Sequence, residues 1–180
     1  HKGVKFHDGT DLDAAAVAWN FERIMDPEEK ALTRPYLEVI ETVEPLDAHT
    51  VKFTLKYPTQ TFLPALAVYP RPFLIKAPST YKTWGQKDAH LHPIGTGPFK
   101  LARWEQNQII VLEKNPDYFK KGLPYLDRIE LKIMKDGITR ATALRAGEVD
   151  FLNYVPKEMV ERISKDPKLQ LLRGQDTQSV

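Results

Sequence analysis

Apolar residues recur in this chain first at helical spacing and then in alternation, and this change of period limits the fold more than any other feature. In the segment 13–25 they recur every three or four residues, at Ala14, Val17, Ala18, Phe21, Ile24 and Met25. This spacing predicts an amphipathic helix, with Asp13 as its N-cap and Pro27 beyond its end.

Alternation follows in the segment 50–57, where Val51, Phe53, Leu55 and Tyr57 are separated by polar residues. A period of two predicts a strand with one buried face. We expect this strand to pair with 38–46 across the turn Asp47-Ala48-His49. A helix and a hairpin therefore open the chain.

Further elements continue the mixture. Strands are predicted over 3–6, 99–105, 108–114, 129–133 and 169–172. Helices are predicted over 61–68, from Pro78 through Trp84 to a stop at Gly85, from Asp136-Gly137 up to Gly147, and from Pro156. Because the elements do not follow a strict βαβ alternation, the pattern predicts a mixed α/β protein.

Composition excludes several classes of function. The 180 residues carry a formal net charge of +2, which is too small an excess for a nucleic-acid partner. The chain has no cysteine, so disulfides and thiol chemistry are excluded. No apolar run approaches the roughly 18 residues of a membrane span.

Two local motifs resemble reactive sites but lack the neighbouring residues that such sites need. GTGPF at 95–99 lacks the further glycines and the helix that a phosphate loop needs, so we expect a structural turn. His90 and His92 are a close pair, but two ligands do not make a metal site. His7 beside Asp8 is interpreted as a turn residue. No nucleophile motif stands out, so no catalytic residue is predicted.

Arg71 lies between Pro70 and Pro72. Both rings fix φ, and each proline favours an extended conformation in the residue before it. One interpretation is a surface arginine in a polyproline-like connector. The other is a preorganised guanidinium, flanked by Tyr69 and Phe73, that binds a carboxylate with two hydrogen bonds.

The first helix and the loop after it carry further polar candidates. Lys30 and Arg34 follow the helix and could add positive charge to the same site. Asn20 is assigned to the polar face of the helix, and Trp19 is interpreted either as core or as the wall of a cleft.

Six stretches in order resemble the large extracytoplasmic solute-binding proteins of ABC importers for peptides and nickel, known as family 5. They cover most of the chain: GVKFHDGTDLDAAAV at 3–17, HTVKFTL at 49–55, PIGTGPFKL at 93–101, LEKNPDYFKKGLPYLDRIELKI at 112–133, TRATALRAGEVDFL at 139–152 and VPKEMVERISKDPKLQLL at 155–172.

The stretch PRPFLIKAPSTYK at 70–82 resembles the nickel-type branch of that family. The resemblance implies that Arg71, with Tyr69 beside it, helps to hold the acidic groups of a small chelator. Lys30 and Thr33 stand where the branch has an arginine and a tryptophan, and Arg34 is the residue that could compensate. The implied ligand-binding residues are therefore Arg71, Arg34, Lys30 and Tyr69, with no metal ligand from the chain.

The resemblance implies an α/β fold of the periplasmic-binding-protein type, a type II clamshell with two lobes. This chain is expected to form most of the first lobe, with mixed sheets and flanking helices, as a fragment without the second lobe. We expect a smaller subdomain over 1–92, a sheet-containing subdomain over 93–155, and a helix and strand over 156–180 that lead to the hinge.

The implied function is capture of a nickel chelate or a small peptide-like solute, without catalysis, and its delivery to an ABC permease. Nickel would enter only as part of the chelate, so no cofactor is expected. Localisation would be periplasmic, or extracellular and tethered to a membrane, in a bacterium or archaeon. The alternatives are an oligopeptide- or dipeptide-binding protein of the same family and the ligand-sensing domain of a transcription regulator.

Overall fold

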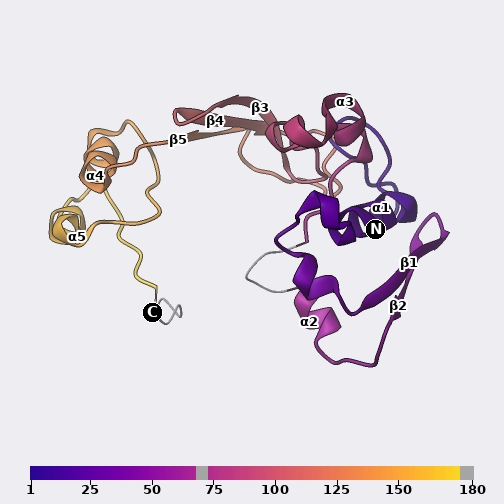
Figure 1. The fold of residues 1–180 in the computed structure, drawn as a ribbon. Helices are drawn as coiled ribbons and strands as arrows, with labels where there is room; N and C mark the ends of the chain where they lie inside the picture. The colour runs from indigo at the N-terminus through magenta and orange to yellow at the C-terminus, as the bar shows by residue number, and fades with distance from the viewer. Residues whose placement is uncertain (68–72, 175–180) are drawn as a thin grey trace. The chain divides into compact units, whose positions relative to one another are not determined.

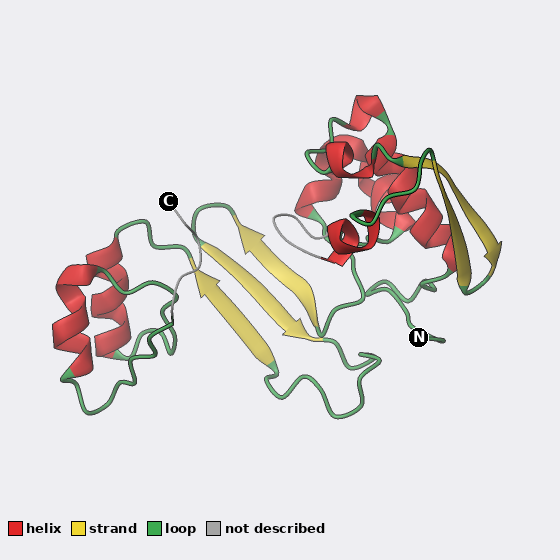
Figure 2. Ribbon diagram, turned by 90° about the horizontal axis from the view of Figure 1, so that it is seen from below, coloured by secondary structure: helices red, strands yellow, loops and turns green. Residues whose placement is uncertain are grey.

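The computed structural model describes residues 1–67 and 73–174 (Figures 1 and 2). Its elements in chain order are α1 (Ala14–Met25), η1 (Pro27–Glu29), η2 (Arg34–Leu37), β1 (Ile40–Asp47), β2 (Thr50–Leu55), α2 (Phe62–Ala67), α3 (Pro78–Asp88), η3 (Ala89–Leu91), β3 (Phe99–Glu105), β4 (Ile109–Lys114), β5 (Arg128–Lys132), α4 (Gly137–Ala146) and α5 (Lys157–Ser164). One compact unit takes His1–Trp104 and Ile110–Glu130, and a second takes Glu105–Ile109 and the chain from Leu131 on.

Helix α1 confirms the helix predicted from residues 13–25. Asp13 caps it, since the side chain of Asp13 accepts a hydrogen bond from the amide of Ala16 at 2.7 Å. The apolar residues at helical spacing then form one buried face, which includes Phe21 and Ile24. In Figure 1 the helix lies beside the β1–β2 hairpin, against which it packs.

The hairpin was also predicted correctly. Strands β1 and β2 pair antiparallel with Val43 opposite Phe53, and Asp47 closes the turn by accepting from the amide of His49 at 2.7 Å. The ring of Phe53 meets the ring of Phe21 edge-on at 4.9 Å. Leu37, which is fully buried, completes this core from η2. The core therefore joins α1, the hairpin and the segment after α1.

The strand predicted over 3–6 is wrong. Lys5 and Asp11 form only an isolated antiparallel bridge, because the chain reverses at once through Gly9, whose φ is +87°. The stop predicted at Gly85 is present as a break, since Gly85 has a φ of 69° within α3. Helical structure resumes after the break and reaches Asp88.

Three strands form a second sheet in the order β3-β4-β5, drawn as three yellow arrows in Figure 2. The strands predicted over 99–105, 108–114 and 129–133 are confirmed, with ends that differ by at most one residue. Asn107, in the turn between β3 and β4, takes a left-handed φ of 60°, a conformation that asparagine tolerates. Within the first unit, the amide of Lys114 donates to the carbonyl of Asp127 at 2.8 Å.

Helices α4 and α5 dominate the second unit. Asp136 caps α4 by accepting from the amide of Thr139 at 2.7 Å, and Gly147 ends it with a φ of 75°. The strand predicted over 169–172 is wrong, because the chain described from Ile133 to Gly174 contains no strand. Leu169 and Leu171 instead pack against the helical cluster of Ala141, Met159 and Ile163.

The subdomain boundaries predicted after residues 92 and 155 stay a prediction. Among the residues that the structure describes, no helix is both long enough and apolar enough to cross a membrane.

Candidate functional site

The loop after α1 carries Lys30 and Arg34, two of the four predicted site residues. Lys30 ends η1 in the left-handed region, at φ 49° and ψ 34°, and its amide donates to the carbonyl of Pro27 at 3.2 Å. Arg34 begins η2, and its amide donates to the carbonyl of Ala31 at 3.0 Å. Two closed turns therefore give this loop a defined backbone path.

Both cations of the loop lack a partner in the described part of the chain. Lys30 is exposed and Arg34 is half-buried. Neither side chain forms an ion pair or a hydrogen bond with another described residue. Because its guanidinium has no carboxylate partner among the described residues, Arg34 can bind an anionic ligand.

Tyr69 and Arg71, the other two predicted site residues, lie outside the described residues. Described residues on either side of that segment pack against one core. Helix α2 contacts η2, and Leu66 packs against the same core as Leu37. Phe73 also packs there and stacks on Phe21 at a ring distance of 6.0 Å. Described residues before and after that segment therefore contact the core that η2 helps to form.

A cluster of four side chains, here named the Arg23 cluster, lies at the base of the loop: Trp19, Arg23, Glu29 and Tyr81. Nη1 of Arg23 lies 2.8 Å from Oε2 of Glu29, and the two side chains are only 14% and 15% exposed. The guanidinium carbon lies 4.7 Å from the ring centre of Tyr81 and 5.7 Å from that of Trp19. This geometry combines an ion pair with cation–π contacts.

Burial also changes the titration of groups near the Arg23 cluster. Desolvation lowers the pKa of Lys76, and the positive charge of Arg23 lowers it further. Desolvation raises the pKa of Tyr81, which therefore stays protonated at neutral pH. The aromatic wall of the cluster is thus uncharged.

The assignment of Asn20 to the polar face of the helix is wrong. Asn20 is fully buried and joins α1 to the segment before α3. Its Nδ2 donates to the carbonyl of Lys76 at 2.8 Å, and its Oδ1 accepts from the amide of Lys76 at 3.0 Å. A buried amide in this position replaces a missing backbone partner. Trp19 is half-buried and meets Tyr81 edge-on at 5.3 Å.

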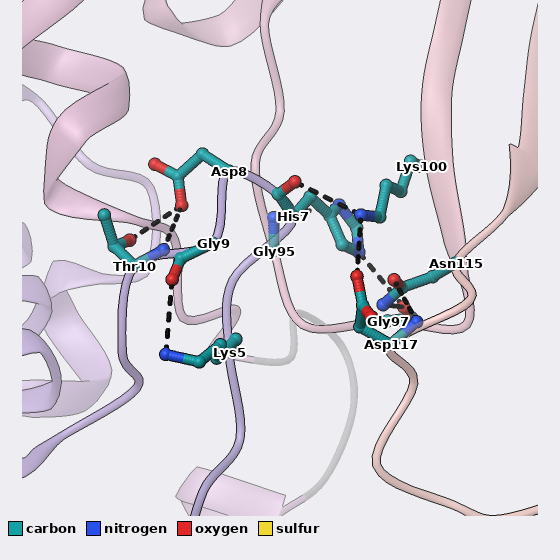
Figure 3. Close-up of polar contacts among 10 residues, drawn as sticks. All are labelled: Lys5, His7, Asp8, Gly9, Thr10, Gly95, Gly97, Lys100, Asn115 and Asp117. Carbon is teal, nitrogen blue, oxygen red and sulfur yellow. Dashed lines mark hydrogen bonds and ion pairs between the residues drawn. The ribbon is translucent and has the colours of Figure 1, made fainter.

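His7 is part of a junction of three chain segments, shown in Figure 3. The carbonyl oxygen of Gly97 lies 3.0 Å from Nε2 of His7 and 3.1 Å from Nδ2 of Asn115. Nζ of Lys100 lies 3.3 Å from the carbonyl of His7. GTGPF is therefore a structural turn, as predicted. Side chains occupy the carbonyl of Gly97, and the backbone amides of His7 and Asn115 occupy those of Gly95 and Pro98.

Asp8, next to His7, joins its own turn at residues 8–10 to α3 through hydrogen bonds from Thr10 and Ser79. Burial raises the pKa of Asp8, but hydrogen bonds from Ser79 and Thr10 more than offset it, so that the net pKa is lowered. The carboxylate is therefore ionised at neutral pH and already fully engaged.

The two close histidines serve local structure. The ring of His92 stacks on Trp84 at 4.3 Å, on the far side of the break at Gly85, and Nδ1 of His90 lies 2.8 Å from the carbonyl of Lys87. Within residues 1–67 and 73–174, no three His, Cys, Asp or Glu side chains gather in a way that could hold a metal ion.

Sequence reasoning missed both Arg23 and Glu29. No periodic signal links them, because the chain changes direction at Pro27 between the two. The burial of Asn20, in contrast, could have been predicted from the sequence. Asn20 lies four residues from both Ala16 and Ile24, which are on the buried face of the helix.

Comparison with known proteins gives the family. The model of the bacterial extracellular solute-binding proteins, family 5 Middle, matches residues 1–180. The glutathione-binding protein GsiB of Pectobacterium atrosepticum is 38% identical over 172 residues, which are 96% of this chain and 33% of GsiB. The chain thus spans about a third of the length of the curated relatives that it matches.

Solved structures agree on the fold. The binding protein AgaA of A. tumefaciens R10, in complex with agropinic acid, superposes with a TM-score of 0.82 at 38% identity over 91% of this chain and 33% of AgaA. NikA of Brucella suis, in complex with Fe(III)-EDTA, gives 0.81 at 31% identity over 92% of this chain and 34% of NikA. The α/β fold predicted for a periplasmic-binding-protein-like chain is confirmed, and the chain belongs to the family 5 bacterial extracellular solute-binding proteins.

Proposed function

We propose that this chain is part of the substrate-binding component of an ABC importer, and that Arg34, Lys30 and Arg71 bind carboxylate groups of its solute. The family is one of binding proteins and not of enzymes, so the site has to hold a molecule without changing its bonds. The observation that carries the proposal is the pair of unpartnered cations on a loop with closed turns.

Arg71 belongs to the proposal through its neighbours. Phe73 packs on the core that includes Leu37, the last residue of the η2 turn that begins at Arg34. Arg71, two residues before Phe73 in the sequence, is proposed to contribute to the same site. Two arginines and a lysine from two segments would then share one site, with Tyr69 beside them.

The ligands of similar proteins support an acidic solute. GsiB is named for glutathione, AgaA was solved with agropinic acid, and NikA was solved with Fe(III)-EDTA. All three ligands carry carboxylate groups. A nickel chelate and a peptide-like acid therefore belong to one chemical class, and the proposal is for that class.

Capture would follow the clamshell mechanism. A second lobe closes over the solute, and because contacts from both lobes exist only in the closed form, the ligand shifts the population toward that form. The closed protein then delivers the solute to a membrane permease outside the cytoplasm. The 180-residue chain alone should bind far more weakly than the full-length protein.

The test is calorimetry on the full-length protein. Glutathione and Ni(II)-histidine are titrated, together with glutathione diethyl ester as a control ligand without carboxylates. Arg71→Ala and Arg34→Ala should each weaken the acid by roughly 2–4 kcal/mol and leave the ester unchanged. If both variants bind every acid as tightly as the unmodified protein, the proposal is wrong.

A further inference from the structure

We infer that Arg23 and Glu29 are positioning residues, which hold the loop of Lys30 and Arg34 in its binding conformation without touching the solute. The inference deepens the proposed function and rests on it for the role of the loop. Its own evidence is the geometry of the Arg23 cluster, whose member Glu29 directly precedes Lys30 in the first compact unit.

Arg23 is poorly suited to bind a solute itself. Its side chain is 14% exposed, and its charge is already compensated by Glu29 at 2.8 Å. Nε of Arg23 is buried and has no partner within the described residues. Rings on α1 and α3 flank the guanidinium, at 5.7 Å for Trp19 and 4.7 Å for Tyr81. Arg23 is therefore a fixed cation between two helices.

Glu29 connects the fixed guanidinium of Arg23 to the loop. It is the last residue of η1, and Lys30 follows directly in the left-handed conformation that turns the chain toward η2. Non-glycine residues adopt that conformation at an energetic cost, which the surrounding contacts have to offset. The ion pair of Glu29, immediately before Lys30, is a contact that can offset this cost.

A second contact from α3 holds the same turn. Nε2 of Gln86 donates to the carbonyl of Glu28 at 3.5 Å. Glu28 and Glu29 are thus both held, one through its backbone and the other through its side chain. The Glu28 side chain is exposed and has no ion pair with the described residues, which makes it a matched control for Glu29.

The decisive measurement is hydrogen exchange of the full-length protein without ligand. The amides of Lys30 and Arg34 donate within the loop, so their exchange reports its local opening. Glu29→Gln, which is nearly isosteric, should speed exchange at both amides about tenfold, because it removes a partly buried ionic partner. Glu28→Gln should not. Unchanged exchange in Glu29→Gln, with the protein folded, would overturn the inference.

A binding cycle tests whether the positioning matters to the solute. With glutathione, Glu29→Gln should weaken binding about fivefold. In an Arg34→Ala background Glu29→Gln should cause a smaller further loss, because the loop then carries only Lys30 of the two contacts that it positions. Fully additive losses would show a general structural effect and contradict the inference. If Arg34→Ala alone binds glutathione normally, the proposed function fails, and hydrogen exchange still decides the role of Glu29.

Discussion

The carbonyl oxygen of Gly97 accepts a hydrogen bond from Nε2 of His7 at 3.0 Å, across 90 positions of sequence. A carbonyl can only accept, so Nε2 carries the hydrogen. The amide of Gly95 donates to Nδ1 at 3.4 Å, so that nitrogen is unprotonated. The geometry at His7 therefore requires the neutral ring.

This requirement predicts a loss of stability in mild acid. Burial lowers the pKa of His7 below 6.5, and Lys100 adds to the effect, while Gly97 and Asp8 oppose it. The unfolded chain therefore takes up the proton more readily than the folded one. The contribution of His7 is complete above pH 6.5 and is lost as the pH falls below it, by at most about 1.4 kcal/mol per pH unit.

Urea denaturation between pH 7.5 and 5, followed by tryptophan fluorescence, measures this loss. His7→Gln keeps a donor and an acceptor but cannot titrate, so its stability should depend less on pH in that range. The pKa of Asp8 lies below 3.8, outside the range of the experiment. Equal pH dependence of the two proteins would assign the effect to other groups.

Asn20 is predicted to be essential for the packing of α1. Asn20→Ala removes the partner of both backbone groups of Lys76, and leaving two partly buried groups unsatisfied should cost about 3 kcal/mol. Chemical denaturation measures the change. Glu22→Ala, at an exposed position of the same helix, is the control and should change stability little. A loss in Asn20→Ala no larger than in Glu22→Ala would contradict the structural role of Asn20.

The elements that were predicted correctly are those whose signal is local. Helix α1 follows from apolar spacing and its Asp13 cap, and the hairpin follows from alternation around a turn that Asp47 closes. The strand predicted over 3–6 failed because the reversal at Gly9 leaves only the single bridge between Lys5 and Asp11. The strand predicted over 169–172 failed because its leucines pack against helices instead of pairing with a strand.

At the candidate site, too, sequence reasoning found only the features with a local signal. Lys30 and Arg34 were found as cations on a loop, but nothing in their own segment indicates that Glu29, just before Lys30, forms a partly buried ion pair with Arg23. Arg23 and Glu29 meet across a change of chain direction, and Tyr81 comes from a helix more than 50 residues away. Contacts of this kind depend on the tertiary fold.

Replacing Gly137 with alanine at the start of α4 is predicted to lower stability, although alanine usually stabilises a helix. Alanine is ordinarily the better helix former by about 1 kcal/mol. A Cβ on Gly137, however, would lie 2.8 Å from Cγ of Pro156, a ring that cannot rotate away. Gly137→Ala should therefore lower stability by about 1–3 kcal/mol, as overpacking does. Gly95→Ala, whose Cβ would meet nothing within 4 Å, is the control for thermal denaturation. A gain in stability for Gly137→Ala would contradict the close approach of Pro156.

Lys30 and Arg34 should affect solute binding through different rate constants. Lys30 is exposed, so its charge acts mainly by attracting the anion before contact. Arg34 is half-buried, so its contact forms once the solute is held. In the full-length protein, Lys30→Gln should lower the association rate of glutathione about threefold and weaken its dependence on salt. Arg34→Gln should instead raise the dissociation rate about tenfold or more.

Stopped-flow measurements at low and at physiological ionic strength separate the two effects. Lys2→Gln is the control for Lys30→Gln, because it also removes an exposed charge but lies outside the loop, and it should leave both rates unchanged. If Lys30→Gln and Arg34→Gln alter the same rate constant to the same extent, their different burial has no kinetic consequence. The assignment of one residue to attraction and the other to retention would then be wrong.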